Sequence, residues 1–128
     1  MRGILIPSSA PAWRTRAERF DDAILDAVES LERRVGKRVA RIEFAVEEVP
    51  PEIVDPASRT YDDESGVPLA SAWPAVRAQP ARVVLYRRPI ESRAPHPEDL
   101  EDFVRELVVE QVADLLGVDP DEIDPPPA

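Results

Sequence analysis

The 15 prolines of this 128-residue chain constrain its fold more than any other feature. They gather in the N-terminal arm, between Pro50 and Pro80, and in the tail that ends in Pro125-Pro126-Pro127. Because proline lacks a backbone N–H and interrupts regular structure, these stretches are predicted to be loops. Roughly 75 residues then remain for packed elements, which is enough for one core built of two layers.

The first packed element is predicted to be an amphipathic helix over residues 16–35. Thr15 and Glu18 have the spacing of a capping box, in which each side chain binds the other's backbone N–H. Apolar residues follow at helical spacing, and Gly36 is a natural stop. These are Phe20, Ala23, Ile24, Ala27, Val28, Leu31 and Val35.

A second long helix is predicted to run from Pro97 to Gly117. Proline suits the first helical position, which places His96 at or beside the N-cap, exposed to solvent. The buried stripe comprises Leu100, Phe103, Val104, Leu107, Val108, Val112, Leu115 and Leu116. Asp119 is expected to cap one further turn, with Ile123 docking back on the core.

Strands are predicted on either side of the central proline-rich stretch. Residues 40–48 alternate apolar and charged side chains, which indicates one buried face. Residues 82–88 include Val83-Val84-Leu85-Tyr86, which is apolar on both faces and typical of a central strand, and Arg87-Arg88-Pro89 ends it. Those arginines are expected to be solvated or paired with carboxylates. Val67-Pro68-Leu69 is expected to be a short edge strand, where proline is tolerated.

Together these elements predict a single soluble α+β domain over residues 15–123. A small mixed sheet is expected to pack against both helices. An extended arm over residues 1–14 and a disordered tail over 124–128 flank that domain.

The formal net charge of −10 bears on the partners of the protein. Nucleic acid and anionic membrane surfaces both require clustered cations, so neither is expected as a partner. The charge is explained by solubility, or by a neutral or basic partner. No apolar run reaches transmembrane length, and the N-terminal apolar run is too short for a signal peptide, so a cytoplasmic protein is expected.

Metal ligands and nucleophiles are scarce in this composition. The chain has no cysteine and one histidine, His96. A catalytic zinc site usually takes three protein ligands, mostly imidazole or thiolate, so this chain cannot build one in the usual way. Sites made only of carboxylates suit calcium, magnesium or manganese. A cysteine nucleophile is excluded, and a Ser-His-Asp triad would have to use a histidine expected at a helix start.

Three polar residues interrupt the apolar stripe of the second long helix. At about 100° per residue, Gln111 falls in the middle of the buried arc, and Glu110 and Asp114 lie one turn apart at its edge. Burying unpaired carboxylates is costly. Either this part of the helix faces a cleft, or the three groups form a polar edge with buried partners. Gln111 is expected to be at least partly buried, with its amide hydrogen-bonded.

From Phe20 to Asp121 the chain resembles the minimal zincin family of small bacterial zincin-like metallopeptidases. The run Leu85-Tyr86-Arg87-Arg88-Pro89-Ile90 is the most specific part of the resemblance. Other matching segments are Arg19-Phe20-Asp21-Asp22, Ala45 to Pro51, Gly66-Val67-Pro68-Leu69 and Val108 to Asp121. In that family the last segment carries His-Glu-x-x-His-x-x-Gly-x-x-Asp, whose histidines and aspartate hold zinc while the glutamate is general base. The resemblance implies a zincin-like fold.

The same resemblance assigns motif positions once Gly117 is matched to the motif glycine. Glu110 and Asp114 then stand at the two histidine positions, Gln111 at the general base and Pro120 at the aspartate. Glutamine cannot accept the proton, and proline offers no side-chain ligand. Neither zinc nor another cofactor is therefore expected, and no catalytic residue.

Three functions remain open at this point. The leading hypothesis is a zincin-like protein without peptidase activity that serves as a binding or scaffold module for an unknown protein or peptide. The alternative is an enzyme of another class that holds Mg²⁺, Ca²⁺ or Mn²⁺ at Glu110 and Asp114, with Asp119 or Asp121 nearby. The third is a purely structural acidic adaptor.

Overall fold

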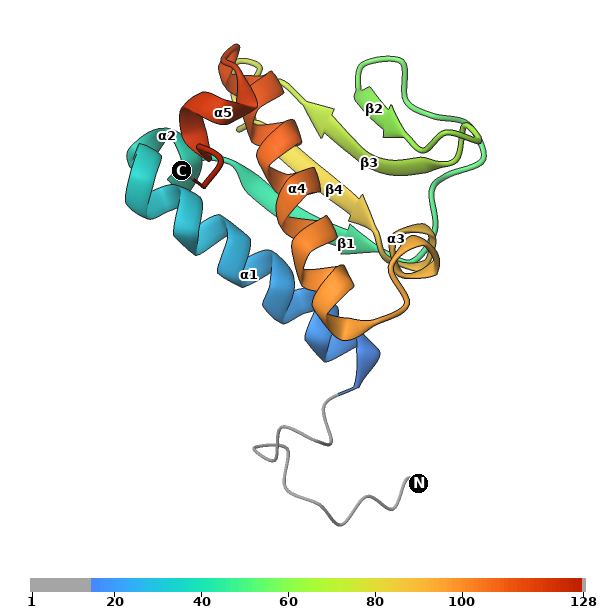
Figure 1. The fold of residues 1–128 in the computed structure, drawn as a ribbon. Coiled ribbons are helices and arrows are strands. Elements are labelled where there is room, and N and C mark those ends of the chain that lie inside the picture. Colours follow the sequence, from blue (N-terminus) through green and yellow to red (C-terminus); the bar gives the residue numbers. More distant parts are fainter. Residues whose placement is uncertain (1–14, 128) are drawn as a thin grey trace.

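A computed structural model describes residues 15–127, so the arm expected over residues 1–14 lies outside the described residues. The described chain is α+β, as predicted, with two long helices on a mixed sheet (Figure 1). Its elements in order are α1 (Arg16–Val35), α2 (Lys37–Ala40), β1 (Glu43–Glu47), β2 (Arg59–Asp62), β3 (Pro68–Trp73), β4 (Arg82–Tyr86), α3 (Arg87–Arg93), α4 (Pro97–Leu116) and α5 (Pro120–Ile123).

The sheet has the strand order β1-β4-β3-β2. Strand β4 pairs in parallel with β1 and antiparallel with β3, and β2 pairs antiparallel with β3. Every residue of β4 from Val83 to Tyr86 is buried, which confirms the prediction of a central strand covered on both faces. In β1 only Phe44 and Val46 are half-buried, as the alternating pattern predicted.

Helices α1 and α4 lie side by side across one face of the sheet (Figure 1). Their apolar stripes meet there and form one core with β3 and β4. The side chains that are wholly or almost wholly inaccessible to solvent include Phe20, Leu31, Leu69, Leu85, Ile90, Val104, Leu107, Val108 and Val112. None of the described helices is both long enough and apolar enough to cross a membrane.

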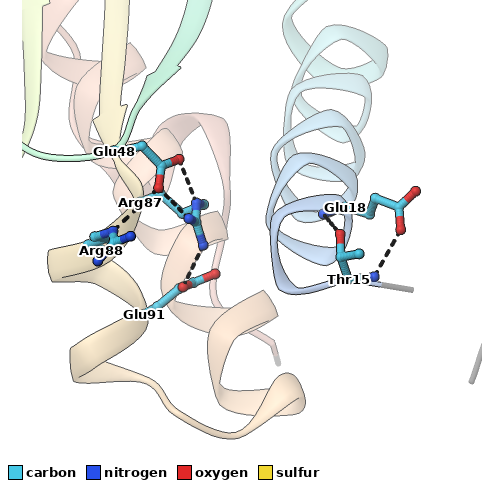
Figure 2. A network of polar contacts seen from close by, with 6 residues as sticks. All are labelled: Thr15, Glu18, Glu48, Arg87, Arg88 and Glu91. Atoms are coloured by element: carbon cyan, nitrogen blue, oxygen red, sulfur yellow. Dashed lines mark hydrogen bonds and ion pairs between the residues drawn. The ribbon is translucent and has the colours of Figure 1, made fainter. Parts of the chain in front are cut away.

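Both long helices begin and end where the sequence predicted. In α1 the Thr15 hydroxyl accepts from the backbone N–H of Glu18 at 3.0 Å (Figure 2). The Glu18 carboxylate in turn accepts from the Thr15 N–H at 2.8 Å. Helix α4 has exposed His96 as its N-cap residue and Pro97 in its first turn. It ends at Gly117, whose φ of 70° is the left-handed conformation that favours glycine.

The stretch from residue 50 to 80 is where the sequence-based prediction was wrong. It contains two strands, β2 and β3, and β3 lies inside the sheet rather than at its edge. Pro68 is tolerated there because it is the first residue of β3 and faces the register shift between Tyr61 and Asp62. The turn between the strands is closed by Asp63, whose carboxylate accepts the backbone N–H groups of Ser65 and Val67.

A second correction concerns two short helices, one before β1 and one after β4, that the sequence did not predict. Residues 37–40 form helix α2 instead of the start of β1, and residues 87–93 form helix α3 directly after β4. The strand predicted over residues 82–88 therefore ends earlier, at Tyr86, and the strand predicted over residues 40–48 spans only Glu43–Glu47. Arg87 is paired with carboxylates, which was one of its two expected states.

The short helix α5 packs against the two long helices, α1 and α4. Asp119 caps it by accepting the backbone N–H of Asp121 at 2.9 Å, and Ile123 is buried, both as predicted. Asp124, where the tail was expected to begin, accepts hydrogen bonds from Arg105 of α4 at 2.6 Å and Arg34 of α1 at 3.3 Å. One carboxylate thus joins both long helices to the chain beyond α5.

Asp124→Asn should lower the free energy of unfolding by about 1 kcal/mol at neutral pH, since this carboxylate is three-quarters buried and paired. The Arg105 guanidinium holds the pKa of Asp124 below its ordinary value, with partial opposition from burial. The stabilisation is therefore present above the unfolded pKa and is lost as pH falls through the lower folded pKa. Urea denaturation across this range should show the two proteins converging in acid. Asp26→Asn, at an exposed site on α1, is the control; equal losses in both variants would contradict the role of Asp124.

Candidate functional site

Gln111 is the buried polar residue in the middle of α4. Its side chain is 4% exposed, although it stands between the apolar residues Val108 and Val112 that fill the core. The position agrees with the prediction from helical spacing. The hydrogen bond expected for its amide is not made with any other group within residues 15–127. The amide atoms nevertheless keep contact with solvent, because Glu91 Oε2 is the only side-chain nitrogen or oxygen of the described residues that is both buried and without a partner.

The amide reaches solvent through a cavity of about 220 Å³ between α4 and β2. Gln111 lines this cavity together with Glu110 and Asp114 of α4. The facing wall is made by Arg59, Thr60 and Tyr61 of the edge strand β2. Of the two arrangements left open by the sequence, the cleft is therefore the one adopted. We call this space the Gln111 cavity.

Asp114 has a partner supplied by β2. The Arg59 guanidinium donates to its carboxylate at 2.9 Å and reaches its backbone carbonyl at 3.5 Å. Both side chains are about half exposed, at 56% and 49%, so the pair contributes little stability. Its consequence is electrostatic: a fixed positive charge already sits on one of the two carboxylates proposed to hold a cation.

The pKa of Tyr61 is raised by partial burial and also by the negative charges on the α4 side of the Gln111 cavity. Partial burial raises the pKa of its hydroxyl above the ordinary value, and the carboxylates of Glu110 and Glu106 raise it further. The phenol therefore stays protonated and able to donate a hydrogen bond. The cavity offers donors from Arg59 and Tyr61, acceptors from the acidic residues, and both from the amide of Gln111.

The candidate metal ligands of the sequence do not gather at one point. Among the residues that the structure describes, no group of three or more histidine or acidic side chains is placed to hold a metal ion. Asp119 is occupied in capping α5, and Pro120 is the first residue of that turn. His96 stands at the other end of α4, roughly 21 Å from Glu110 along the axis at 1.5 Å per residue. The donor set present therefore does not fit a zinc ion.

A second polar cluster lies at the far end of β4 and serves the fold. Arg87 bridges Glu48, just after β1, and Glu91 of α3 (Figure 2). Its Nε lies 2.8 Å from the Glu48 carboxylate, and its Nη1 lies 2.8 Å from that of Glu91. Hydrogen bonding to Arg87 lowers the pKa of Glu48, and the two carboxylates raise that of Arg87. The cluster joins a strand end to a helix through ion pairs of Arg87 with Glu48 and Glu91.

Sequence reasoning missed the half of the cavity wall that comes from β2. Thr60 and Tyr61 are strand-favouring residues, which was the available signal, but acidic residues and glycine follow them closely. Arg59 precedes Asp114 by 55 residues, so no local pattern could pair them. The three polar positions of α4 were identified correctly because helical geometry alone places them.

A family model described as a zincin-like metallopeptidase matches residues 39–126, which is more than half of the chain. The match spans the whole sheet, α3, α4 and α5, and therefore every residue that lines the Gln111 cavity. No curated protein matches the chain.

Two substitutions at residue 111 test the environment of the amide. Gln111→Met should leave the free energy of unfolding unchanged or raise it by up to about 1 kcal/mol, since it replaces a partnerless amide by an apolar side chain of similar length. Gln111→Glu should lower it by about 1–3 kcal/mol at neutral pH, because the new carboxylate is desolvated beside Glu110 while Arg59 is bound to Asp114.

The pH dependence separates the two variants. Burial raises the folded pKa of the introduced carboxyl, so its destabilising effect is full above that folded pKa and disappears below the unfolded pKa. Urea denaturation at neutral pH and near pH 4 measures both effects. A loss of well over about 1 kcal/mol in Gln111→Met would mean that the wild-type amide has a partner after all.

Proposed function

The chain belongs to the zincin-like metallopeptidase family, and from that premise we propose that it is a non-catalytic member that binds a peptide segment without metal. The proposal rests on the identity of residue 111, which is a glutamine. It stands at the general-base position of the family motif when Gly117 is matched to the motif glycine. An amide cannot take a proton from water, whereas a glutamate at the same place can.

The neighbouring motif positions support the same conclusion. Glu110 and Asp114 replace the two histidines in this register, and Pro120 replaces the third ligand. A zinc ion bound there would supply a polarised water, but carboxylates without imidazole favour harder cations. Arg59 supplies a cation from the chain itself, bound to Asp114 at 2.9 Å. In this proposal the guanidinium neutralises the site in place of a metal.

The alternative of a Mg²⁺, Ca²⁺ or Mn²⁺ enzyme is weakened by the same contact. Such an ion takes six or more oxygen ligands, several of them from the protein in a dedicated calcium site. Glu110 and Asp114 supply two carboxylates, and Arg59 would have to leave one of them. Asp119 is committed to the α5 cap, which removes another candidate oxygen.

A peptide is the ligand class that suits the cavity and the strand beside it. Among residues 15–127, strand β2 pairs only with β3, so its outer side is a sheet edge to which an extended segment can add. Beside that edge, the Gln111 amide offers one acceptor and two donors, which match the N–H and C=O of a peptide group. The unpaired amide then gains its hydrogen bonds on binding.

Peptide binding is tested with sequences selected from a random library on untagged protein in the presence of EDTA. We expect bound peptide to shift the backbone NMR signals of residues 59–62 and 110–114. Gln111→Met should weaken binding roughly tenfold, because a buried hydrogen bond is lost. The matched control is Gln79→Met, in an exposed turn away from the cavity. Binding that needs a divalent ion, or that both variants weaken equally, would contradict the proposal.

Zinc binding tests the absence of the metal site. Untagged protein exposed to excess zinc and desalted should retain no stoichiometric zinc by elemental analysis and should not cleave a quenched fluorescent peptide library. The positive control carries Glu110→His, Gln111→Glu, Asp114→His and Pro120→Asp together, and should bind zinc by calorimetry. One zinc per wild-type chain would overturn the proposal. A folded control variant that binds no zinc would show that the register set by Gly117 is wrong.

A further inference from the structure

A cavity of about 650 Å³ lies apart from the Gln111 cavity, between α2, the turn over residues 74–81 and the end of α4. Its volume falls within the range of roughly 300–1,000 Å³ that is typical of small-molecule sites. None of its lining residues belongs to the Gln111 cavity. It therefore needs an explanation of its own, beyond the proposed function.

One side of this second cavity is apolar and held in place. Ile42, Leu115 and Leu116 form part of it, and Val76 projects from the turn with 60% of its surface exposed. The turn is closed by two backbone hydrogen bonds between Val76 and Gln79, at 3.0 and 2.6 Å. An exposed valine on a closed turn beside two leucines presents a preformed apolar surface.

The other side carries three arginines, Arg38, Arg41 and Arg77. None of them makes an ion pair with a carboxylate within the described residues, although the chain has 26 acidic residues. Six other arginines are paired, namely Arg34, Arg59, Arg87, Arg88, Arg93 and Arg105. The described Arg16, Arg19, Arg33 and Arg82 also lack an ion pair, but none of them lines this cavity. In a protein of net charge −10, three unpaired guanidinium groups around one apolar cavity form a local excess of positive charge.

One of these arginines is also positioned. Arg38 donates from Nη2 to the backbone carbonyl of Leu116 at 3.3 Å, at the end of α4. That contact uses one of the five N–H donors of the guanidinium and holds its stem along the cavity wall. The remaining donors, with those of Arg41 and Arg77, are free for a ligand.

We propose that this cavity binds a small organic carboxylate that carries an apolar body. Guanidinium groups bind carboxylates through two parallel hydrogen bonds. A carboxylate ligand therefore explains why one side of the cavity carries arginines instead of apolar residues. The apolar body then covers Val76 and the two leucines. A cation is disfavoured by the three arginines, and an uncharged apolar ligand would leave them unused.

Sodium octanoate, below the concentration at which it self-associates, is the probe. Titration followed by backbone NMR should give saturable shifts at residues 76–81 and 115–116. The double variant Arg41→Gln/Arg77→Gln should weaken binding by about tenfold or more, since charge-assisted hydrogen bonds are lost. The control Arg16→Gln/Arg33→Gln removes the same charge outside the cavity and should leave affinity within about twofold, because only screened long-range attraction changes.

Octylammonium, of the same length and opposite charge, should not bind. The proposal is overturned if octanoate gives no saturable shift at these residues, if the control variant loses as much affinity as the test variant, or if octylammonium binds equally well. None of these outcomes depends on whether the Gln111 cavity binds a peptide.

Discussion

Helix α4 packs against both α1 and the sheet, and its burial is the constraint from which both the core and the candidate site follow. Leu107, Val108 and Val112 are fully buried in the core that joins the layers. Each such side chain contributes roughly 1.5–3 kcal/mol when removed from water, which is far more than any surface ion pair in this molecule. The helix cannot rotate about its axis without losing these contacts. Burial of these apolar side chains therefore fixes the direction in which the polar residues between them point.

That constraint explains why Gln111 is tolerated without a partner. Rotation that would expose the amide would also expose Val108 and Val112, at a greater cost than one unmade hydrogen bond. The protein accommodates the amide by leaving a cavity against β2. Arg59 and Tyr61 then complete a wall of mixed charge around a group that can both donate and accept. The same helix ends at Gly117, so its final turn also contributes to the wall of the arginine-lined cavity.

Many arginines of this chain lie at contacts between elements or around the Gln111 cavity and the arginine-lined cavity. Most carboxylates are exposed and hold the protein at a net charge of −10. Several arginines serve to join elements, as Arg87 does between β1 and α3 and Arg105 does between α4 and the chain beyond α5. Arg59 joins β2 to α4 in the same manner, but it does so at the mouth of a cavity. The family to which the chain belongs uses a metal cation in its motif, and our proposal gives that electrostatic role to an arginine.

The sequence predicted the parts of the fold that rest on local periodicity. Helices α1 and α4 were placed correctly because apolar spacing and end signals such as Thr15 and Gly117 agree. Strand β4 was predicted from its continuous apolar run. Strand β3 was missed as an interior strand because Ala70, Ser71 and Ala72 give no alternation, although all three are buried. Half of the Gln111 cavity was missed for a related reason: the contact of Arg59 with Asp114 is set by the sheet's strand order, which no short pattern encodes.

The central claim is that an arginine, and not a metal, neutralises the carboxylates of the Gln111 cavity. The most direct measurement is a crystal structure of the untagged protein soaked in zinc, with anomalous scattering recorded above and below the zinc absorption edge. We expect no zinc-specific anomalous peak within bonding distance of Glu110 or Asp114, and we expect the Arg59 guanidinium to remain in contact with Asp114. A strong zinc peak coordinated by these carboxylates, with Arg59 displaced, would contradict it.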